Sequence, residues 1–160
     1  MPPFTANELV FGIAMGGTTR GLLVGLVVYL AMSIFVEMTI YNLFYVLIFA
    51  FSASLMLSLL GLIGGIWSEK FDHIAAVTNF IVTPLSFLSG TFYSIARLPE
   101  FGQTMAYINP FFYMIDGFRY GYIGFCDVNP IIGVSVISCI NGVLWLVCWR
   151  MFKTGYRLKP

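Results

Sequence analysis

Four long stretches with almost no charged residues constrain this chain more than any other feature of its sequence. They cover residues 17–36, 41–67, 74–96 and 128–149, and their only charged residue is Arg20, in the opening turn of the first. A helix needs about 20 predominantly apolar residues to cross a bilayer, where its backbone groups must all be hydrogen-bonded internally. The sequence therefore predicts an all-α, polytopic membrane helical bundle with four transmembrane helices.

The composition supports the same conclusion. Of the 160 residues, 59% are hydrophobic and only 9% are charged, whereas a soluble domain carries about 25% charged residues. A water-soluble fold of this size buries only about 70% of the surface that its unfolded chain exposes, so it cannot hide this much apolar surface. The net charge of +1 gives no basis for a nucleic-acid partner. We expect a single transmembrane domain over residues 1–160, in contact with membrane lipids.

The segment 98–125 differs from the four stretches. It is aromatic and apolar, but Pro99, Gly102, Pro110 and Gly117 interrupt it, and it carries charges. Segments of this kind lie in the membrane interface, or enter the bilayer part-way and return, with aromatic rings at headgroup depth. We expect an interfacial or re-entrant segment here, and a fifth span is the alternative.

The basic residues predict the orientation. Lys and Arg are enriched in the cytoplasmic loops of membrane proteins, and four spans place both ends of the chain on one side. If that side is the cytoplasm, most basic residues lie inside (Arg20, Lys70, Arg150, Lys153, Arg157 and Lys159), and only Arg97 and Arg119 lie outside. We therefore expect both termini of this chain to be cytoplasmic.

Small residues follow one face of three of the stretches. In lipid the hydrophobic effect does little to drive helices together, so close approach through small residues matters more. The stripes consist of Gly17, Gly21 and Gly25 in the first stretch, Ser54, Ser58, Gly61 and Gly65 in the second, and Ser138 and Gly142 in the fourth. We expect these stripes to be helix-packing surfaces rather than ligand sites.

The third stretch combines a proline with mild polarity. Pro84 lies mid-way along it, where a proline removes one backbone hydrogen bond and kinks a helix. Asn79, Thr83, Ser86 and Ser89 share this stretch at spacings of three and four residues. Two interpretations stay open: these side chains line a route for an amphipathic substrate, or they form hydrogen bonds within the bundle.

The sequence pattern contains no group of residues suited to catalysis. The single histidine, His73, lies in a charged loop, and Cys126, Cys139 and Cys148 lack the spacing of metal ligands. No glycine-rich phosphate loop followed by Lys and Ser/Thr occurs. Ion-coupled transporters place Asp, Glu or His within a span, and the four stretches contain none of these. We expect no enzyme, and no cofactor or metal in this chain; energy for any transport would come from elsewhere.

Residues 80–124 carry a more specific signal. They read FIVTPLSFLSGTFYSIARLPEFGQTMAYINPFFYMIDGFRYGYIG. This segment closely resembles the end of the membrane permease of type-2 ABC transporters (the ABC-2 family), nearest to the branch with the YadH-like permeases and the nodulation-factor and drug exporters. The matching elements are the Pro84 span, the exit FLSGTFYS, the turn at Pro99, the Asn109-Pro110 step and the run YMIDGFRYG. Residues 2–23 resemble the cytosolic segment after the family's second span and the start of its third.

The resemblance implies a permease of six spans, of which this chain corresponds to spans three to six. It implies a bacterial inner-membrane complex of two permease copies, as a homodimer or heterodimer, with two cytosolic ABC ATPase subunits that bind ATP and magnesium. The expected substrate is a drug, a lipid-linked glycan or a lipo-oligosaccharide. Because the family's first two spans are missing, we expect the four-span chain to be unstable or inactive alone.

The resemblance also supplies three sets of candidate residues. The candidates for coupling to the ATPase are Pro2, Pro3, Glu8, Glu69 and Lys70. The candidates for the substrate pathway are Asn79, Thr83, Pro84, Ser86 and Ser89, and those for the outer gate are Tyr93, Pro110, Tyr113, Asp116 and Arg119. The alternative function is a structural or assembly membrane protein with four spans and no transport role.

Overall fold

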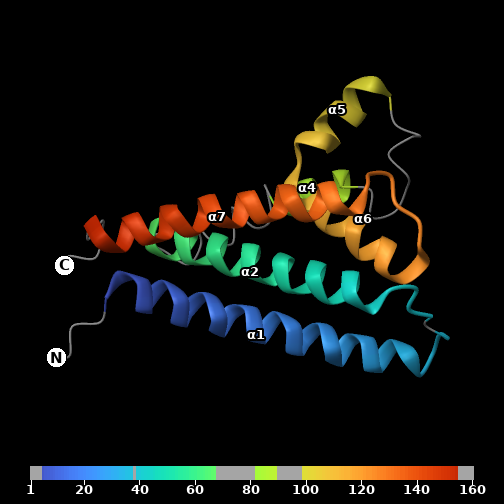
Figure 1. Ribbon diagram of the computed structural model, residues 1–160, viewed down its shortest axis with the longest axis horizontal. Coiled ribbons are helices and arrows are strands. Elements are labelled where there is room, and N and C mark those ends of the chain that lie inside the picture. Colours follow the sequence, from blue (N-terminus) through green and yellow to red (C-terminus); the bar gives the residue numbers. More distant parts are fainter. Residues whose placement is uncertain (1–4, 38, 68–81, 90–98, 155–160) are drawn as a thin grey trace.

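The computed structural model describes residues 5–37, 39–67, 82–89 and 99–154. Within these ranges every regular element is a helix, which confirms the all-α prediction for this part of the chain (Figure 1). The helices are α1 (Ala6–Ser33), α2 (Leu43–Trp67), α4 (Thr83–Leu88), α5 (Glu100–Ile108), α6 (Pro110–Ile123) and α7 (Pro130–Thr154). Three of them, α1, α2 and α7, are long and apolar enough to cross a membrane.

Helix α1 begins well before the first predicted span, 17–36. It starts at Ala6 because Thr5 and Glu8 form a capping box. The Glu8 carboxylate accepts a hydrogen bond from the backbone N–H of Thr5 at 2.8 Å, and the Thr5 hydroxyl accepts one from the N–H of Glu8 at 3.4 Å. Such a box satisfies two N–H groups that have no partner inside the helix, so the helix starts well before the apolar stretch.

The other predicted spans agree to different degrees with the helices of the structure. The second, 41–67, matches α2 closely. The fourth, 128–149, is shifted, because α7 begins at Pro130, a residue suited to a first helical position, and continues to Thr154. Of the third, 74–96, only the part at 82–89 lies among the described residues, and it contains the short helix α4.

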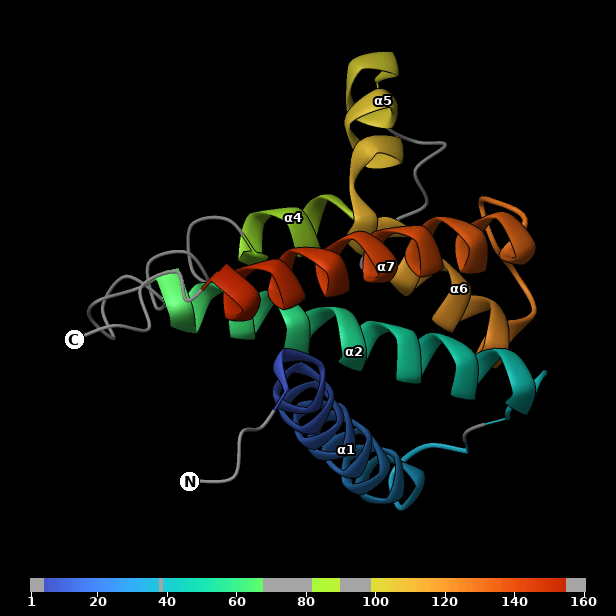
Figure 2. The same ribbon diagram turned by 60° about the vertical axis from the view of Figure 1, so that its left-hand side comes forward.

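The three long helices form a bundle along the long axis of the molecule (Figures 1 and 2). α1 runs antiparallel to both α2 and α7, so the first turn of α1 lies at the same end as the last turns of α2 and α7 (Figure 1). α6 packs along α2 and α7 at the opposite end, while α5 extends away from the bundle in both views. The bundle therefore has one end built from three helices and one end to which α6 is added.

The small residues of α1 and α2 meet where the two helices pack. A Cβ atom added at Gly17 would collide with the hydroxyl of Ser58, and one added at Gly21 would lie 2.7 Å from the hydroxyl of Ser54. The Ser58 hydroxyl donates a hydrogen bond to the carbonyl of Ala14 at 3.2 Å. The packing role expected for these glycines is confirmed, because only glycine lets the serine hydroxyls approach the α1 backbone.

The packing role does not extend along the whole of each stripe. A Cβ atom added at Gly25, Gly61, Gly65 or Gly142 would have no described neighbour within 4 Å. For these positions the expectation is wrong within the part of the chain that the structure describes. Along these stripes, α1 and α2 approach closely at Gly17 and Gly21, whereas the other glycine positions are open.

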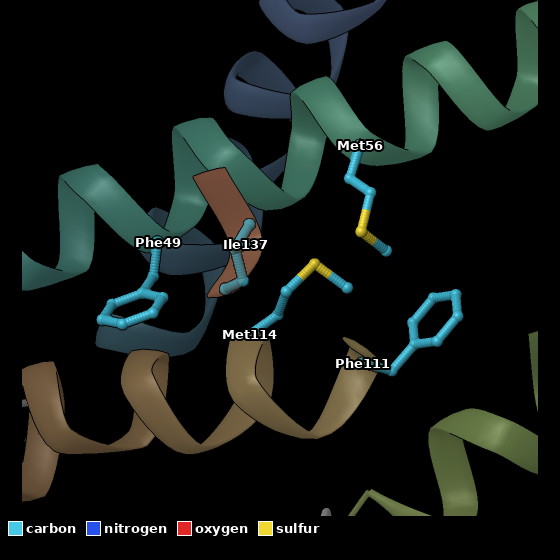
Figure 3. Close-up of a cluster of buried hydrophobic side chains, with 5 residues drawn as sticks. All are labelled: Phe49, Met56, Phe111, Met114 and Ile137. Carbon is cyan, nitrogen blue, oxygen red and sulfur yellow. The ribbon is translucent and has the colours of Figure 1, made fainter. Parts of the chain in front are cut away.

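Two buried clusters hold the bundle together. One lies between α2, α6 and α7 and consists of Phe49, Met56, Phe111, Met114 and Ile137, each at most 6% exposed (Figure 3). The second lies at the other end, between α1, α2 and α7, and consists of Val10, Ala14, Leu59 and Cys148. The first cluster fixes the position of α6, which carries four of the nine described candidate residues.

Candidate functional site: helix α6 and its anchors

Helix α6 extends from the middle of α2 to the start of α2. Its first turns contribute Phe111 and Met114 to the cluster that contains Met56 (Figure 3), and near its end Gly121 packs on Val46. The helix has 14 residues, or roughly 21 Å of length. The hydrocarbon core of a bilayer is about 30 Å thick, so α6 is too short to cross it.

Asn109 anchors the start of α6. Its backbone is extended, which separates α5 from α6, and its side-chain oxygen accepts a hydrogen bond from the N–H of Phe111 at 3.0 Å. Its side-chain nitrogen donates to the carbonyl of Leu85 in α4 at 2.6 Å, and its backbone N–H donates to Ala106 at 3.0 Å. Its own carbonyl accepts from Phe112. A helix break at membrane depth requires this complete bonding, because lipid supplies no partners.

Asp116 anchors the second half of α6 to the start of α7. This carboxylate is 3% exposed. One oxygen accepts hydrogen bonds from the N–H of Asp127 at 2.9 Å and from the Arg119 guanidinium at 2.5 Å, and the other accepts from the N–H of Val128 at 3.0 Å. Arg119 also pairs with Asp127 at 2.6 Å and lies over the ring of Phe125. One buried carboxylate thus fixes both an adjacent cation and the turn before α7.

Backbone hydrogen bonds anchor the end of α6 to the start of α2. Helices end with carbonyls that have no partner inside the helix. The N–H of Asn42 donates to the carbonyl of Gly121 at 2.9 Å, and the N–H of Tyr41 donates to that of Tyr122 at 3.3 Å. Gly124 then ends the helix at φ 75°, in the left-handed region that glycine adopts readily. The last carbonyls of α6 are therefore bonded to a different element.

Tyrosine rings surround this end of the bundle. The ring of Tyr120 lies 5.8 Å from Tyr41 and 5.2 Å from Tyr45 in edge-to-face geometry, and Tyr29 and Tyr122 are 6.4 Å apart. Tyr and Trp are enriched where helices leave the hydrocarbon core, because one part of the ring is apolar and the other polar. Such a cluster is typical of the end of a helical bundle that lies at a membrane surface.

Comparison with known proteins identifies the chain's relatives. A family model described as ABC-2 type transporter matches residues 1–123. The chain belongs to the ABC-2 type transporter family. Among its relatives, the "Inner membrane transport permease YadH" of Escherichia coli K12 is 34% identical over 157 residues, and its counterparts in Escherichia coli O157:H7 and Shigella flexneri match to the same extent.

These alignments cover 98% of this chain and 61% of each relative, so the chain spans less than two thirds of their length. No solved structure matches it. The resemblance seen in residues 80–124 is confirmed, and the YadH-like permeases are among the relatives found.

In this ABC-2 family member, four of the five outer-gate candidates lie on one helix. Pro110 is the first residue of α6, where its fixed φ suits a helix start, and the hydroxyl of Tyr113 donates to the carbonyl of Tyr107 at 2.8 Å. Asp116 and Arg119 form the ion pair described above. Tyr93 lies outside the described residues. The structure therefore brings this set together around the anchors of α6.

The described pathway candidates lie on α4. Pro84 is in the first turn of this helix, and the part of the chain before Val82, including Asn79, lies outside the described residues. The Ser86 hydroxyl donates to the carbonyl of Val82 at 2.8 Å, and the buried Ser89 hydroxyl donates to that of Ser86 at 2.5 Å. Thr83 is exposed. Both serine hydroxyls are thus bonded to backbone carbonyls of their own segment.

Of the ATPase-coupling candidates, only Glu8 lies among the described residues. It is bonded to Thr5 in the capping box at the start of α1. Pro2, Pro3, Glu69 and Lys70 lie outside the described residues. The structure therefore gives Glu8 a local role in starting α1, at the end of the bundle opposite to α6 (Figure 1).

Three polar residues important to the structure were not among the sequence-based candidates. Asn109 and Asp127 anchor the two ends of the α6 region. Asn141 lies in the middle of α7, is 8% exposed, and donates from its side-chain nitrogen to the carbonyl of Ser52 in α2 at 3.1 Å. A lone amide in an otherwise apolar span is a signal for an interhelical hydrogen bond, so Asn141 could have been found from the sequence.

Proposed function

We propose that this chain is a membrane-spanning subunit of an ATP-driven exporter and forms part of the path for an amphipathic substrate, such as a drug, a lipid-linked glycan or a lipo-oligosaccharide. The observation that carries the proposal is the match of residues 1–123 to the ABC-2 type transporter family. In this proposal a cytosolic ABC ATPase subunit binds ATP and magnesium, and a second permease copy completes the path. Pro2, Pro3, Glu8, Glu69 and Lys70 are the proposed contacts to the ATPase.

The proposed topology has both termini of this chain in the cytoplasm of a bacterial inner membrane. α1, α2 and α7 are spans in this proposal, and a further span covers 74–96. The basic residues Arg150 and Lys153 in the last turns of α7 support this orientation, because Lys and Arg are enriched on the cytoplasmic side of a membrane. The tyrosine cluster then lies at the outer surface, and α6 is a re-entrant helix that enters from outside.

The proposed role of α6 is to close the outer end of the path. Its start is bonded to α4 through Asn109, and its second half is bonded to the turn before α7 through Asp116. A substrate passing beside α4, along Asn79, Thr83, Pro84, Ser86 and Ser89, would reach this helix before leaving the membrane. Tyr93, Pro110, Tyr113, Asp116 and Arg119 are the proposed gate residues.

Co-purification tests the proposed function. A tagged version of the native protein, extracted from its own host in mild detergent, is expected to bring with it a protein that is photolabelled by an azido-ATP analogue. ATP hydrolysis is expected in that complex but not in the isolated chain. Recovery without any nucleotide-binding protein, together with unchanged export in a deletion strain, would favour the structural or assembly role.

Thiol labelling tests the proposed sidedness. Cys126 is partly exposed in the loop before α7, whereas Cys139 faces outward from the middle of α7 and Cys148 is fully buried near its end. A membrane-impermeant maleimide added to intact spheroplasts is therefore expected to modify Cys126 and not Cys148. The Cys126→Ser variant is the control and should lose the signal. Modification of Cys126 only after the membrane is opened would invert the proposed topology.

The labelling rate should also depend on pH. Burial, followed by the charge of Asp116, raises the pKa of the Cys126 thiol above its ordinary value. The thiolate is the reactive form, so a raised pKa leaves less of it at neutral pH. We expect labelling of Cys126 to be slower at pH 7 than that of a free thiol in solution, and its rate to go on rising to a higher pH. A rate that levels off at the same pH as for a free thiol would contradict the raised pKa.

A further inference from the structure

A groove of about 660 Å³ lies between α1 and α2, in the half of the bundle that contains the start of α1. Four glycines, Gly16, Gly17, Gly61 and Gly65, line it, together with Ser58 and Arg20. At Gly16, Gly61 and Gly65 an added Cβ atom would have no described neighbour within 4 Å. The groove is therefore open because side chains are missing from both of its walls.

Arg20 is a charged residue inside a membrane helix. If Ser33 marks the outer boundary of the hydrocarbon core, a span of about 20 residues ends near Ala14. Arg20 then lies about six residues, or ~9 Å, inside that boundary. Arg20 is exposed, and it forms no ion pair with any residue that the structure describes. An ionisable side chain at this depth needs a partner that offsets its loss of water.

The direction of the side chain places its charge in the groove. Side chains of a helix lean toward its N-terminus, so the Arg20 guanidinium extends over the turn that carries Gly16 and Gly17, toward the nearer membrane surface. The charge therefore lies nearer to the lipid phosphates of that surface than the Cα atom of Arg20 does. Beyond Arg20, the side chains of Leu23, Val24 and Val27 follow on the same face, and each is more than half exposed.

We propose that this groove is a binding site for an anionic phospholipid of the leaflet nearest the start of α1. The guanidinium binds the lipid phosphate, because its planar N–H groups match phosphate oxygens. The glycines leave room for the headgroup, and an acyl chain lies along Leu23, Val24 and Val27. The argument rests on the charge and shape of the groove and does not depend on export.

The test uses the whole chain in nanodiscs of phosphatidylcholine, with or without phosphatidylglycerol. The melting temperature of the wild type is expected to rise when phosphatidylglycerol is present, because a ligand of the native state stabilises it. Native mass spectrometry should detect retained phosphatidylglycerol. Arg20→Gln is expected to lose both effects. Arg150→Gln, which removes an exposed cation at the same end of the bundle but outside the groove, should keep them.

A pair of glycine variants tests the groove with Arg20 in place. Gly61→Leu fills the groove, whereas Gly64→Leu adds the same side chain at a glycine that does not line it; neither added Cβ meets a described atom within 4 Å. Only Gly61→Leu is expected to lose lipid retention. Equal retention in the two variants would overturn the proposal, and this pair decides the question if Arg20→Gln does not fold.

Two further outcomes would also overturn it. Stabilisation of the wild type by inorganic phosphate in phosphatidylcholine alone, to the same extent as by phosphatidylglycerol, would indicate a site for free phosphate rather than lipid. The second outcome is that phosphatidylglycerol leaves the melting temperature of the wild type unchanged, whereas Glu69→Gln or Asp72→Asn lowers it. This would indicate that a carboxylate of this chain is the partner of Arg20.

Discussion

Replacing Asp116 with alanine is expected to lower the free energy of unfolding by about 3 kcal/mol or more, because it leaves two backbone N–H groups without their acceptor and removes one of the two carboxylates that pair with Arg119. The Asp116 carboxylate accepts from two backbone N–H groups and from Arg119, and it is 3% exposed. After the substitution, the N–H groups of Asp127 and Val128 would lack this acceptor. The turn that starts α7 would then lose its attachment to α6.

Thermal melting in detergent measures this effect. For a chain of this length, 3 kcal/mol corresponds to a fall of about 6 °C or more in the melting temperature. Glu100→Gln is the matched control, because it removes an exposed carboxylate at the start of α5 and should change little. In Asp116→Ala with Arg119→Ala, the bond between these two side chains is lost only once, so the combined loss should be smaller than the sum of the single losses. A melting temperature for Asp116→Ala equal to that of Glu100→Gln would show that the carboxylate is not a structural anchor.

The sequence predicted helix type and the approximate position of the long helices, because each span must satisfy its backbone internally and this demands a long apolar run. It did not predict where α1 starts. Apolar content marks where lipid lies, whereas helix boundaries depend on caps, and the capping box of Thr5 and Glu8 precedes the apolar run. The same distinction explains α7, whose helix continues past Trp149 to Thr154 after the apolar stretch has ended.

The candidate site was predicted in part. The run YMIDGFRYG lies on α6, and the interruptions at Pro110 and Gly117 predict an interfacial or re-entrant segment there. In the structure Pro110 starts the helix and Gly117 is a helical residue in close contact with α2. The partners of Asp116 are backbone groups eleven and twelve residues away along the chain. Backbone donors carry no residue-type signal, so sequence alone could not reveal them.

The anchors also limit how a gate at α6 can move. Its start is bonded to α4, its second half to the turn before α7 and its end to the start of α2. Opening the outer end by moving α6 alone would break all three sets of bonds. A movement in which α6 travels with α2 and α7 as one unit preserves the last two sets, so we expect α4 and α5 to change position relative to that unit.

Gly121→Ala is expected to destabilise the protein and to resist rescue, whereas Gly117→Ala should be rescued by a smaller partner. Both glycines face α2, but they meet different atoms. A Cβ atom at Gly117 would collide with the ring of Phe49, which is a side chain, whereas one at Gly121 would lie 2.5 Å from the Cγ2 atom of Val46 and also 2.9 Å from its backbone nitrogen. Overpacking of this kind costs about 1–3 kcal/mol.

The double variants separate the two cases. Phe49→Leu removes the ring atoms that the new methyl group meets, so Gly117→Ala with Phe49→Leu should be more stable than the sum of the single losses predicts, by about 0.5–3 kcal/mol. Val46→Ala removes the Cγ2 atom but leaves the backbone nitrogen and Cα of residue 46 in place, so it should relieve Gly121→Ala only in part, and less than Phe49→Leu relieves Gly117→Ala. Gly142→Ala, at an open position on α7, is the control and should be neutral or stabilising, since alanine favours a helix by up to about 1 kcal/mol over glycine. Equal relief of both glycine variants, measured by thermal melting, would mean that α6 can shift away from α2 and is not held by its backbone bonds to Tyr41 and Asn42.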